Sequence, residues 1–269
     1  MKLRLVPALQ GWRWVQQGLL TAKAQPVAFM ALIGLVVSSL LLLTSLPVIG
    51  PILALGLMPT AWMGFILASH MTSQGQRVTP SVLIEPWRSL HAPRKEWLTL
   101  GAVHATTFLF TMQLADWLGP GAEALQLAQQ EAKDLAELVR DPRVQADALW
   151  SIGLTLPVSL LFFHTPALVF WGRVPVGKAI FFSAIASWRN LTSFVVYGLS
   201  WFAVIQLAAL LIGVVALLIP IPMLVEVIAV MIIMWTLSAA QASIYFVVMD
   251  CFEAPNQQDK SDLAPSPKE

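Results

Sequence analysis

The sequence has few charged residues, and this scarcity excludes most classes of soluble protein. Only 12% of its 269 residues are charged and 57% are hydrophobic, whereas about a quarter of a typical soluble domain is charged. Sixteen Lys and Arg against fifteen Asp and Glu leave a net charge of +1, without the basic excess of a nucleic-acid-binding protein. A single cysteine excludes a disulfide framework and any multi-cysteine metal site. The composition indicates an integral membrane protein.

The sequence also lacks the short motifs of common catalytic sites. It contains no Walker loop, no dinucleotide-binding glycine pattern, no His-Glu-x-x-His helix and no Gly-x-Ser-x-Gly elbow. Paired acids of the kind used by intramembrane aspartyl proteases are missing as well. We therefore predict a protein that is not an enzyme, with no metal and no cofactor.

Long apolar stretches are present instead. A bilayer core of about 30 Å requires roughly 20 apolar residues in a helix. Six such stretches lie at about 26–46, 48–70, 97–118, 150–172, 191–218 and 221–249. We predict an all-α polytopic membrane protein with six transmembrane helices in three hairpins, which together form a domain at residues 26–252.

Basic residues are distributed unevenly between the two sides of this predicted topology. Thirteen of the sixteen Lys and Arg lie on the side of the two termini, and only Lys133, Arg140 and Arg143 lie on the other. By the positive-inside rule, both termini are predicted to be cytoplasmic. Residues 1–25 are long for the start of a signal peptide, and no cleavage site follows, so we expect them to remain as a basic amphipathic segment.

Two further segments lie outside the predicted spans. Residues 119–149 contain six acidic side chains and apolar residues at helical spacing up to Asp141-Pro142, which predicts a periplasmic amphipathic helix. Its apolar face either covers the bundle or offers a docking surface to another protein. Residues 253–269 are polar and rich in proline, so we predict a disordered cytoplasmic tail.

A basic and aromatic stretch precedes each predicted hairpin, so one unit recurs three times. Adjacent Trp and Arg side chains suit the headgroup level of a bilayer. We predict that these stretches form cytoplasmic interfacial helices that contact membrane lipid, anionic lipid above all, through Trp12, Arg13, Trp87, Arg88, Trp188 and Arg189. A pseudo-threefold arrangement of the three units is a hypothesis.

Two stretches of the sequence resemble a known family. One is Pro7–Trp14, with the sequence PALQGWRW, and the other runs from Phe163 to Leu199. They are similar to a family of uncharacterised integral membrane proteins common in betaproteobacteria. The resemblance implies a location in the bacterial inner membrane, and it carries over no activity and no catalytic residue.

Three ionisable side chains within the predicted spans are candidates for an intramembrane polar site. Glu226 is the only carboxylate well inside a span, and its cost in lipid indicates either a proton-linked or cation-linked role or a structural partner. His104 and His164 are predicted at similar depth on antiparallel spans, as a metal or haem site would require. A carboxylate or cysteine at ligand spacing is missing, so hydrogen bonds between helices are the alternative.

Other polar residues form faces on single helices. Gln241 shares a helix face with Ser238 and Tyr245, and such a face either joins two helices or lines a cavity. Gln206 lies apart from these faces.

Small residues recur at every fourth position of the second span, at Gly56, Thr60, Gly64 and Ala68. Such a seam admits close approach either of a helix of the same chain or of a second copy in a homo-oligomer.

The leading hypothesis for function is a non-catalytic accessory, assembly or scaffold component that binds a membrane-protein partner and anionic lipid, with no nucleic acid involved. The alternative is a transporter or channel for a small or amphiphilic solute, with Glu226, helices kinked by proline and the polar faces along its path. Lipid handling at the cytoplasmic leaflet is a third, weaker hypothesis.

Overall fold

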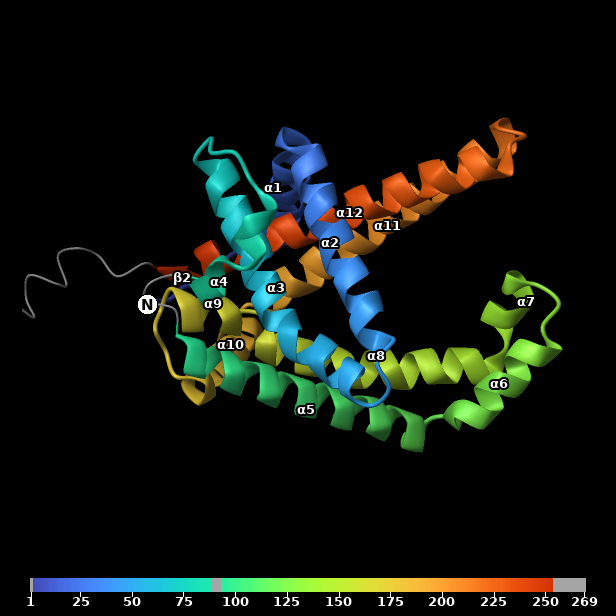
Figure 1. The fold of residues 1–269 in the computed structure, drawn as a ribbon, viewed down its shortest axis with the longest axis horizontal. Coiled ribbons are helices and arrows are strands. Elements are labelled where there is room, and N and C mark those ends of the chain that lie inside the picture. The colour runs from blue at the N-terminus through green and yellow to red at the C-terminus, as the bar shows by residue number, and fades with distance from the viewer. Residues whose placement is uncertain (1, 89–92, 254–269) are drawn as a thin grey trace, which may run out of the picture. The chain divides into compact units, whose positions relative to one another are not determined.

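The structure is a computed structural model that describes residues 2–88 and 93–253, and Figure 1 shows its course from blue at the N-terminus to red. Six spans in the described residues are long and apolar enough to cross a membrane. They are α2 (Pro26–Thr44), α3 (Ile49–Ser73), α5 (Arg94–Leu118), α8 (Pro142–Phe162) continued by α9 (Thr165–Phe170), α11 (Leu191–Leu218) and α12 (Pro222–Cys251). The prediction of an all-α polytopic membrane protein is confirmed.

Shorter elements flank the spans. They are the strands β1 (Lys2–Leu3) and β2 (Phe252–Glu253), the 3₁₀ helix η1 (Pro80–Leu83), and the helices α1 (Gln10–Ala24), α4 (Glu85–Arg88), α6 (Gly121–Glu131), α7 (Leu135–Arg140) and α10 (Val176–Arg189). The two strands pair antiparallel, with Leu3 opposite Phe252. The predicted disordered tail lies, from residue 254 on, outside the described residues.

The three interfacial stretches differ from one another more than the predicted repeat implies. The first and third form single helices, α1 of 15 residues and α10 of 14. The second is divided between η1 and α4, and residues 89–92 after α4 lie outside the described part of the chain. Pro80 and Pro86 lie in these two short elements, and proline cannot donate a backbone hydrogen bond inside a longer helix.

The acidic loop differs from the single predicted helix. It consists of α6 and α7, and the fourth span begins at Pro142 rather than near residue 150. Asp134 accepts a hydrogen bond from the backbone N–H of Glu137, and Asp141 accepts one from that of Arg143, both at 2.8 Å. These N-caps start α7 and α8, and Pro142 in the first turn of α8 reinforces the second start.

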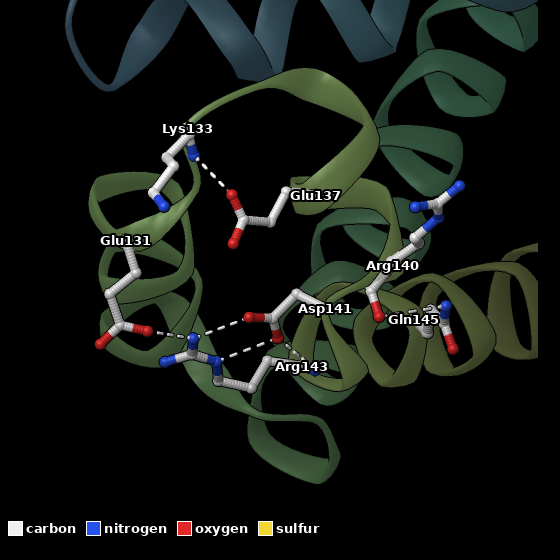
Figure 2. Close-up of polar contacts among 7 residues, drawn as sticks. All are labelled: Glu131, Lys133, Glu137, Arg140, Asp141, Arg143 and Gln145. Atoms are coloured by element: carbon white, nitrogen blue, oxygen red, sulfur yellow. Dashed lines mark hydrogen bonds and ion pairs between the residues drawn. The ribbon is translucent and has the colours of Figure 1, made fainter.

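An ion-pair cluster holds this loop together (Figure 2). The Arg143 guanidinium lies 2.5 Å from Glu131 on α6 and 2.7 Å from Asp141. This hydrogen-bonded guanidinium lowers the pKa of the Asp141 carboxyl to about 2. The end of α6 is thereby tied to the start of α8.

Contacts between Cα atoms divide the chain into two compact units. Unit 1 contains Met1–Val36, Met63–Glu85 and Ile185–Glu269, and unit 2 contains Val37–Trp62 and Pro86–Ala184. The hairpin of α2 and α3 contributes residues to both units, so the packing units do not coincide with the three predicted hairpins.

Unit 1 is built around α1, which packs against α12 and α11, while α11 and α12 lie side by side (Figure 1). Trp14 and Val15 of α1 are fully buried. A Cβ at Gly18 would lie 2.5 Å from the Ser243 Cβ, so the backbone of α1 closely approaches α12. A second cluster joins Phe29 on α2 to Phe65 on α3.

Unit 2 contains α5 and α8, which lie against each other (Figure 1). The α3 segment of this unit meets α5 where Gly56 faces Gly101, and a Cβ at Gly101 would lie 2.5 Å from the Gly56 carbonyl oxygen. At the start of α5, Glu96 accepts a hydrogen bond of 2.9 Å from the backbone N–H of Val176, the first residue of α10. The contact between Gly56 and Gly101 and the hydrogen bond to the Glu96 carboxylate thus position α5 against α3 and α10.

Candidate functional site

A cluster of polar side chains in unit 1 anchors α1 to the end of α12. Asp250 accepts hydrogen bonds from Gln10 Nε2 and from Trp14 Nε1 through the same oxygen, Oδ2, and both are 2.7 Å long. The Trp14 ring also contacts the rings of Phe194 and Tyr197 on α11, with centroids 5.9 Å apart in each case. One carboxylate and one indole therefore connect three helices.

Asn190, between α10 and α11, holds the segment that precedes α1. It is buried, its Oδ1 accepts from the backbone N–H of Val6 at 2.9 Å, and its Nδ2 donates to the carbonyl oxygen of Arg4 at 3.1 Å. Ser193 Oγ lies 3.2 Å from the carbonyl oxygens of Val6 and Pro7, to which it donates. The bond from Ser193 to Pro7 joins the two stretches of sequence, 7–14 and 163–199, on which the family resemblance rests.

Sequence reasoning missed Asn190 and Asp250 as anchors. Asn190 is polar at the start of an apolar run, and Asp250 is the acid at the end of the last span. Both positions are ordinary for a membrane protein, so the residue types alone carried no signal. The hydrogen bonds that make them anchors, from Val6 to Asn190 and from Trp14 to Asp250, span 184 and 236 positions of the chain.

His70 forms part of a second polar cluster in unit 1. Its Nδ1 lies 3.1 Å from Tyr245 Oη on α12, and its Nε2 lies 3.1 Å from Gln74 Nε2. Nearby, Gln25 donates to Thr72 Oγ1 and to the carbonyl oxygen of Gln76. These contacts tie the junction of α1 and α2 to the end of α3.

His104 lies in unit 2, in an aromatic environment on α5. Its Nδ1 donates a 2.7 Å hydrogen bond to the carbonyl oxygen of Leu55 on α3. Ring centroids of Trp62, Phe108 and Phe162 lie 5.3, 4.3 and 5.0 Å from that of the imidazole. The buried Nε2 has no hydrogen-bond partner in the part of the chain that the structure describes. His104 therefore forms a hydrogen bond between helices, one of the two alternatives that its sequence position left open.

His164 lies at the break between α8 and α9, also in unit 2. Its backbone N–H donates to Ser183 Oγ at 3.0 Å, and its Nδ1 lies 3.5 Å from the same oxygen. Ser183 in turn donates to the carbonyl oxygen of Leu160. Pro166 begins the following turn, so Ser183 satisfies backbone groups at a break in the helix.

The remaining two candidates lie far apart on one helix. Glu226 and Gln241 are separated by 15 residues of α12, which corresponds to about 22 Å of helix rise. Glu226 is exposed, and Gln241 is half-buried with an unpartnered Oε1 in the described residues. The structure therefore does not bring Glu226 and Gln241 into one site. Across the described ranges, no group of three or more His, Cys, Asp or Glu is arranged to hold a metal.

The small-residue seam of α3 is used for packing within the chain. In unit 2, Gly56 faces Gly101; in unit 1, a Cβ at Gly64 would lie 3.0 Å from the Leu83 Cα. Thr60 and Ala68 are buried.

Most of the predicted interfacial residues lie on the surface of the protein. Trp12, Arg13, Arg88, Trp188 and Arg189 are exposed, and Trp87 is half-buried.

Comparison with curated proteins finds a relative described as a probable inner membrane protein in Burkholderia thailandensis. It is 34% identical over 210 residues, which are 76% of this chain and 76% of the relative. The chain belongs to this inner membrane protein family. No family model and no solved structure matches it. The predicted resemblance to an uncharacterised inner-membrane family is confirmed.

The spans of this inner membrane protein differ in how much the chain itself covers them. Half of the apolar window of α3 is buried, but only 6% of that of α11 and 17% of those of α2 and α12. Among the polar side chains of the hairpin formed by α11 and α12, Gln206 and Glu226 are exposed. Neither forms a hydrogen bond within the described residues 2–88 and 93–253, so each faces whatever surrounds the hairpin in the membrane.

Proposed function

We propose that this inner membrane protein is a non-catalytic accessory or scaffold component that holds a membrane-spanning partner and anionic lipid. One observation carries the proposal: the anchoring polar groups form hydrogen bonds within the chain, whereas the intramembrane carboxylate of Glu226 has no partner among the described residues and faces outward. His104 and Ser183 bind carbonyl oxygens inside unit 2, and Tyr197 Oη lies 2.6 Å from Ser243 Oγ inside unit 1. A solute path would require polar groups that face an internal space.

The outward face of α12 suits a second helix with complementary charge. Glu226, Val230, Ile233 and Leu237 recur at spacings of four, three and four residues, and all four are exposed. A carboxylate in this apolar stripe is costly in lipid, and a Lys or Arg from another span at the same depth would satisfy it. The proposed partner is therefore a membrane protein with a basic side chain near one end of a span.

The lipid part of the proposal rests on exposed Trp and Arg side chains next to the spans. In unit 1, Trp12 and Arg13 on α1 and Trp188 and Arg189 on α10 are exposed, although the opposite face of α1 is buried. Amphipathic aromatic rings and guanidinium groups are favoured at the level of the headgroups. Predicted cytoplasmic termini would place these side chains at the anionic leaflet.

Purification from the native membrane in mild detergent, followed by mass spectrometry, tests the proposal. We expect a stoichiometric membrane-protein partner that is retained by the wild type and lost in Glu226→Leu. The matched control is Val230→Leu, on the same face of α12, which keeps the face apolar and retains Glu226. Wild type and Val230→Leu that both purify with lipid alone, and with no protein partner, would contradict the partner role.

Flux assays in liposomes test the transport alternative with the same residue. The proposal predicts no robust solute or ion flux from the purified protein. Flux that disappears in Glu226→Gln would replace the scaffold proposal with transport.

A further inference from the structure

We infer that two copies of this chain pair through the outward face of α11, with Gln206 of one copy bonded to Gln206 of the other. Gln206 lies 15 residues after the start of α11 and 12 before its end, about 22 Å and 18 Å along the helix. The amide is therefore near the middle of the span. It is exposed and forms no hydrogen bond to other described residues.

The surface around Gln206 is apolar and continuous along the helix. The residues within about 60° of Gln206 around the helix axis are all exposed. Apart from Thr192 near the start of α11 they are apolar, and they are Leu191, Val195, Leu199, Phe202, Ala203, Ala209, Leu210, Gly213 and Leu217. Gly213 has open space where a Cβ would be, so packing within the chain does not require this glycine. Ala209 and Gly213 form the low part of the surface, where a second helix backbone can approach closely.

Lipid can cover the apolar side chains of this face but cannot bond the amide. Hydrocarbon chains are as apolar as leucine, so the apolar residues alone gain little from a protein partner. A glutamine amide leaves its donors and its acceptor unsatisfied in hydrocarbon, which favours any arrangement that pairs it.

A second copy provides this pairing without any other protein. Two parallel copies of α11 related by a twofold axis along the membrane normal place the same residue at the same depth. An amide both donates and accepts, so two Gln206 side chains can bond reciprocally, whereas two carboxylates such as Glu226 would repel each other. This symmetry is why we assign self-association to α11 and a basic partner to α12.

The inference deepens the proposed function, on which it rests, by naming a second copy as one partner of the scaffold. The two are separable by experiment, because they use different helices. Loss of a co-purifying protein in Glu226→Leu concerns α12, and loss of the dimer in Gln206→Leu concerns α11.

Disulfide crosslinking in native membranes tests the inference. The chain has one cysteine, the buried Cys251, so single-cysteine variants can be built on Cys251→Ala. Phe202→Cys and Leu207→Cys are a matched pair, because these side chains are 61% and 65% exposed. They lie about 140° apart around the helix, with Phe202 on the Gln206 face.

We expect mild oxidation to crosslink Phe202→Cys to a dimer and to leave Leu207→Cys largely monomeric. Adding Gln206→Leu to Phe202→Cys should lower the dimer yield by about fivefold or more, and Gln206→Asn should retain most of it. Both changes are at an exposed position, so thermal unfolding should stay unchanged. Equal crosslinking of the two cysteines, or a yield unaffected by Gln206→Leu, would overturn the inference, even if another protein still co-purifies.

Discussion

Trp14 donates its indole N–H to Asp250 at 2.7 Å, although 236 positions separate the two residues in the chain. The same carboxylate binds Gln10, so the N-terminal helix is fastened to the end of the last span. This contact explains why α1, which the sequence predicts as an interfacial helix, has a buried face as well as an exposed one. The anchoring of α1 is accordingly a property that mutation can test.

Replacing Asp250 by Ala should destabilise the protein. Asp250 accepts two hydrogen bonds, and hydrogen bonds to a charged group contribute about 1.5–3 kcal/mol each. We therefore expect the free energy of unfolding to fall by about 3–6 kcal/mol. Reversible unfolding in detergent measures the change. The control is Asp116→Ala, at an exposed acid for which the described residues offer no ion pair or hydrogen bond. Equal effects of the two substitutions would contradict the anchoring role.

Replacing Gly101 by Ala should weaken the contact between α3 and α5. The new Cβ would lie 2.5 Å from the Gly56 carbonyl oxygen, and neither backbone can yield without displacing its helix. Overpacking of this kind costs about 1–3 kcal/mol. Gly153→Ala on α8 is the matched control, because open space surrounds that position. Thermal unfolding should therefore separate the variants, with Gly153→Ala neutral or stabilising by up to about 1 kcal/mol.

The acidic loop should loosen at low pH. Arg143 lowers the pKa of Asp141 from 3.8 to about 2, so the contribution of Asp141 to stability is complete above pH of about 4 and is lost as the pH falls through about 2. Pepsin digestion between pH 4 and pH 2 measures the change as faster cleavage near α7. Asp141→Asn still caps α8 but cannot ionise, so its cleavage should depend less on pH. A wild-type profile identical to that of Asp141→Asn would refute the ion-pair assignment.

Neutralising the exposed arginines of α1 and α10 should reduce bound anionic lipid. Each basic residue near a charged surface contributes about 1 kcal/mol, which corresponds to about fivefold in affinity. We expect Arg13→Gln combined with Arg189→Gln to lower the phosphatidylglycerol retained after purification, as measured by lipid mass spectrometry. Arg140→Gln, on the predicted opposite side, is the control. Lys at both positions should restore binding if the arginines only anchor, and should fail if they grip phosphates in two-point contacts.

The predictions from sequence were most accurate where the physical cause is local. An apolar run of about 20 residues must form a helix in lipid, whatever lies beside it, so α2, α3, α5, α11 and α12 appear close to their predicted ranges. The start of α8 was predicted late because Asp141 and Pro142 were interpreted as the end of one helix, whereas they begin the next. A capping residue looks the same from either side in sequence.

The candidate site was less predictable. Glu226 and Gln241 lie on one helix but at different levels, and Asn190 and Asp250 gave no sign of their roles. A polar residue reveals its function only through its partner, and here the partners come from distant segments.

The sequence by itself determined the membrane class, the number of spans and the family, because lipid forces each span to satisfy its own backbone and to be long and apolar enough. Only the tertiary structure decided which polar groups are used for internal bonds and which face outward. That distribution depends on how each helix is rotated about its axis and on which distant segment packs against it. Neither quantity is encoded in the local pattern that makes a span.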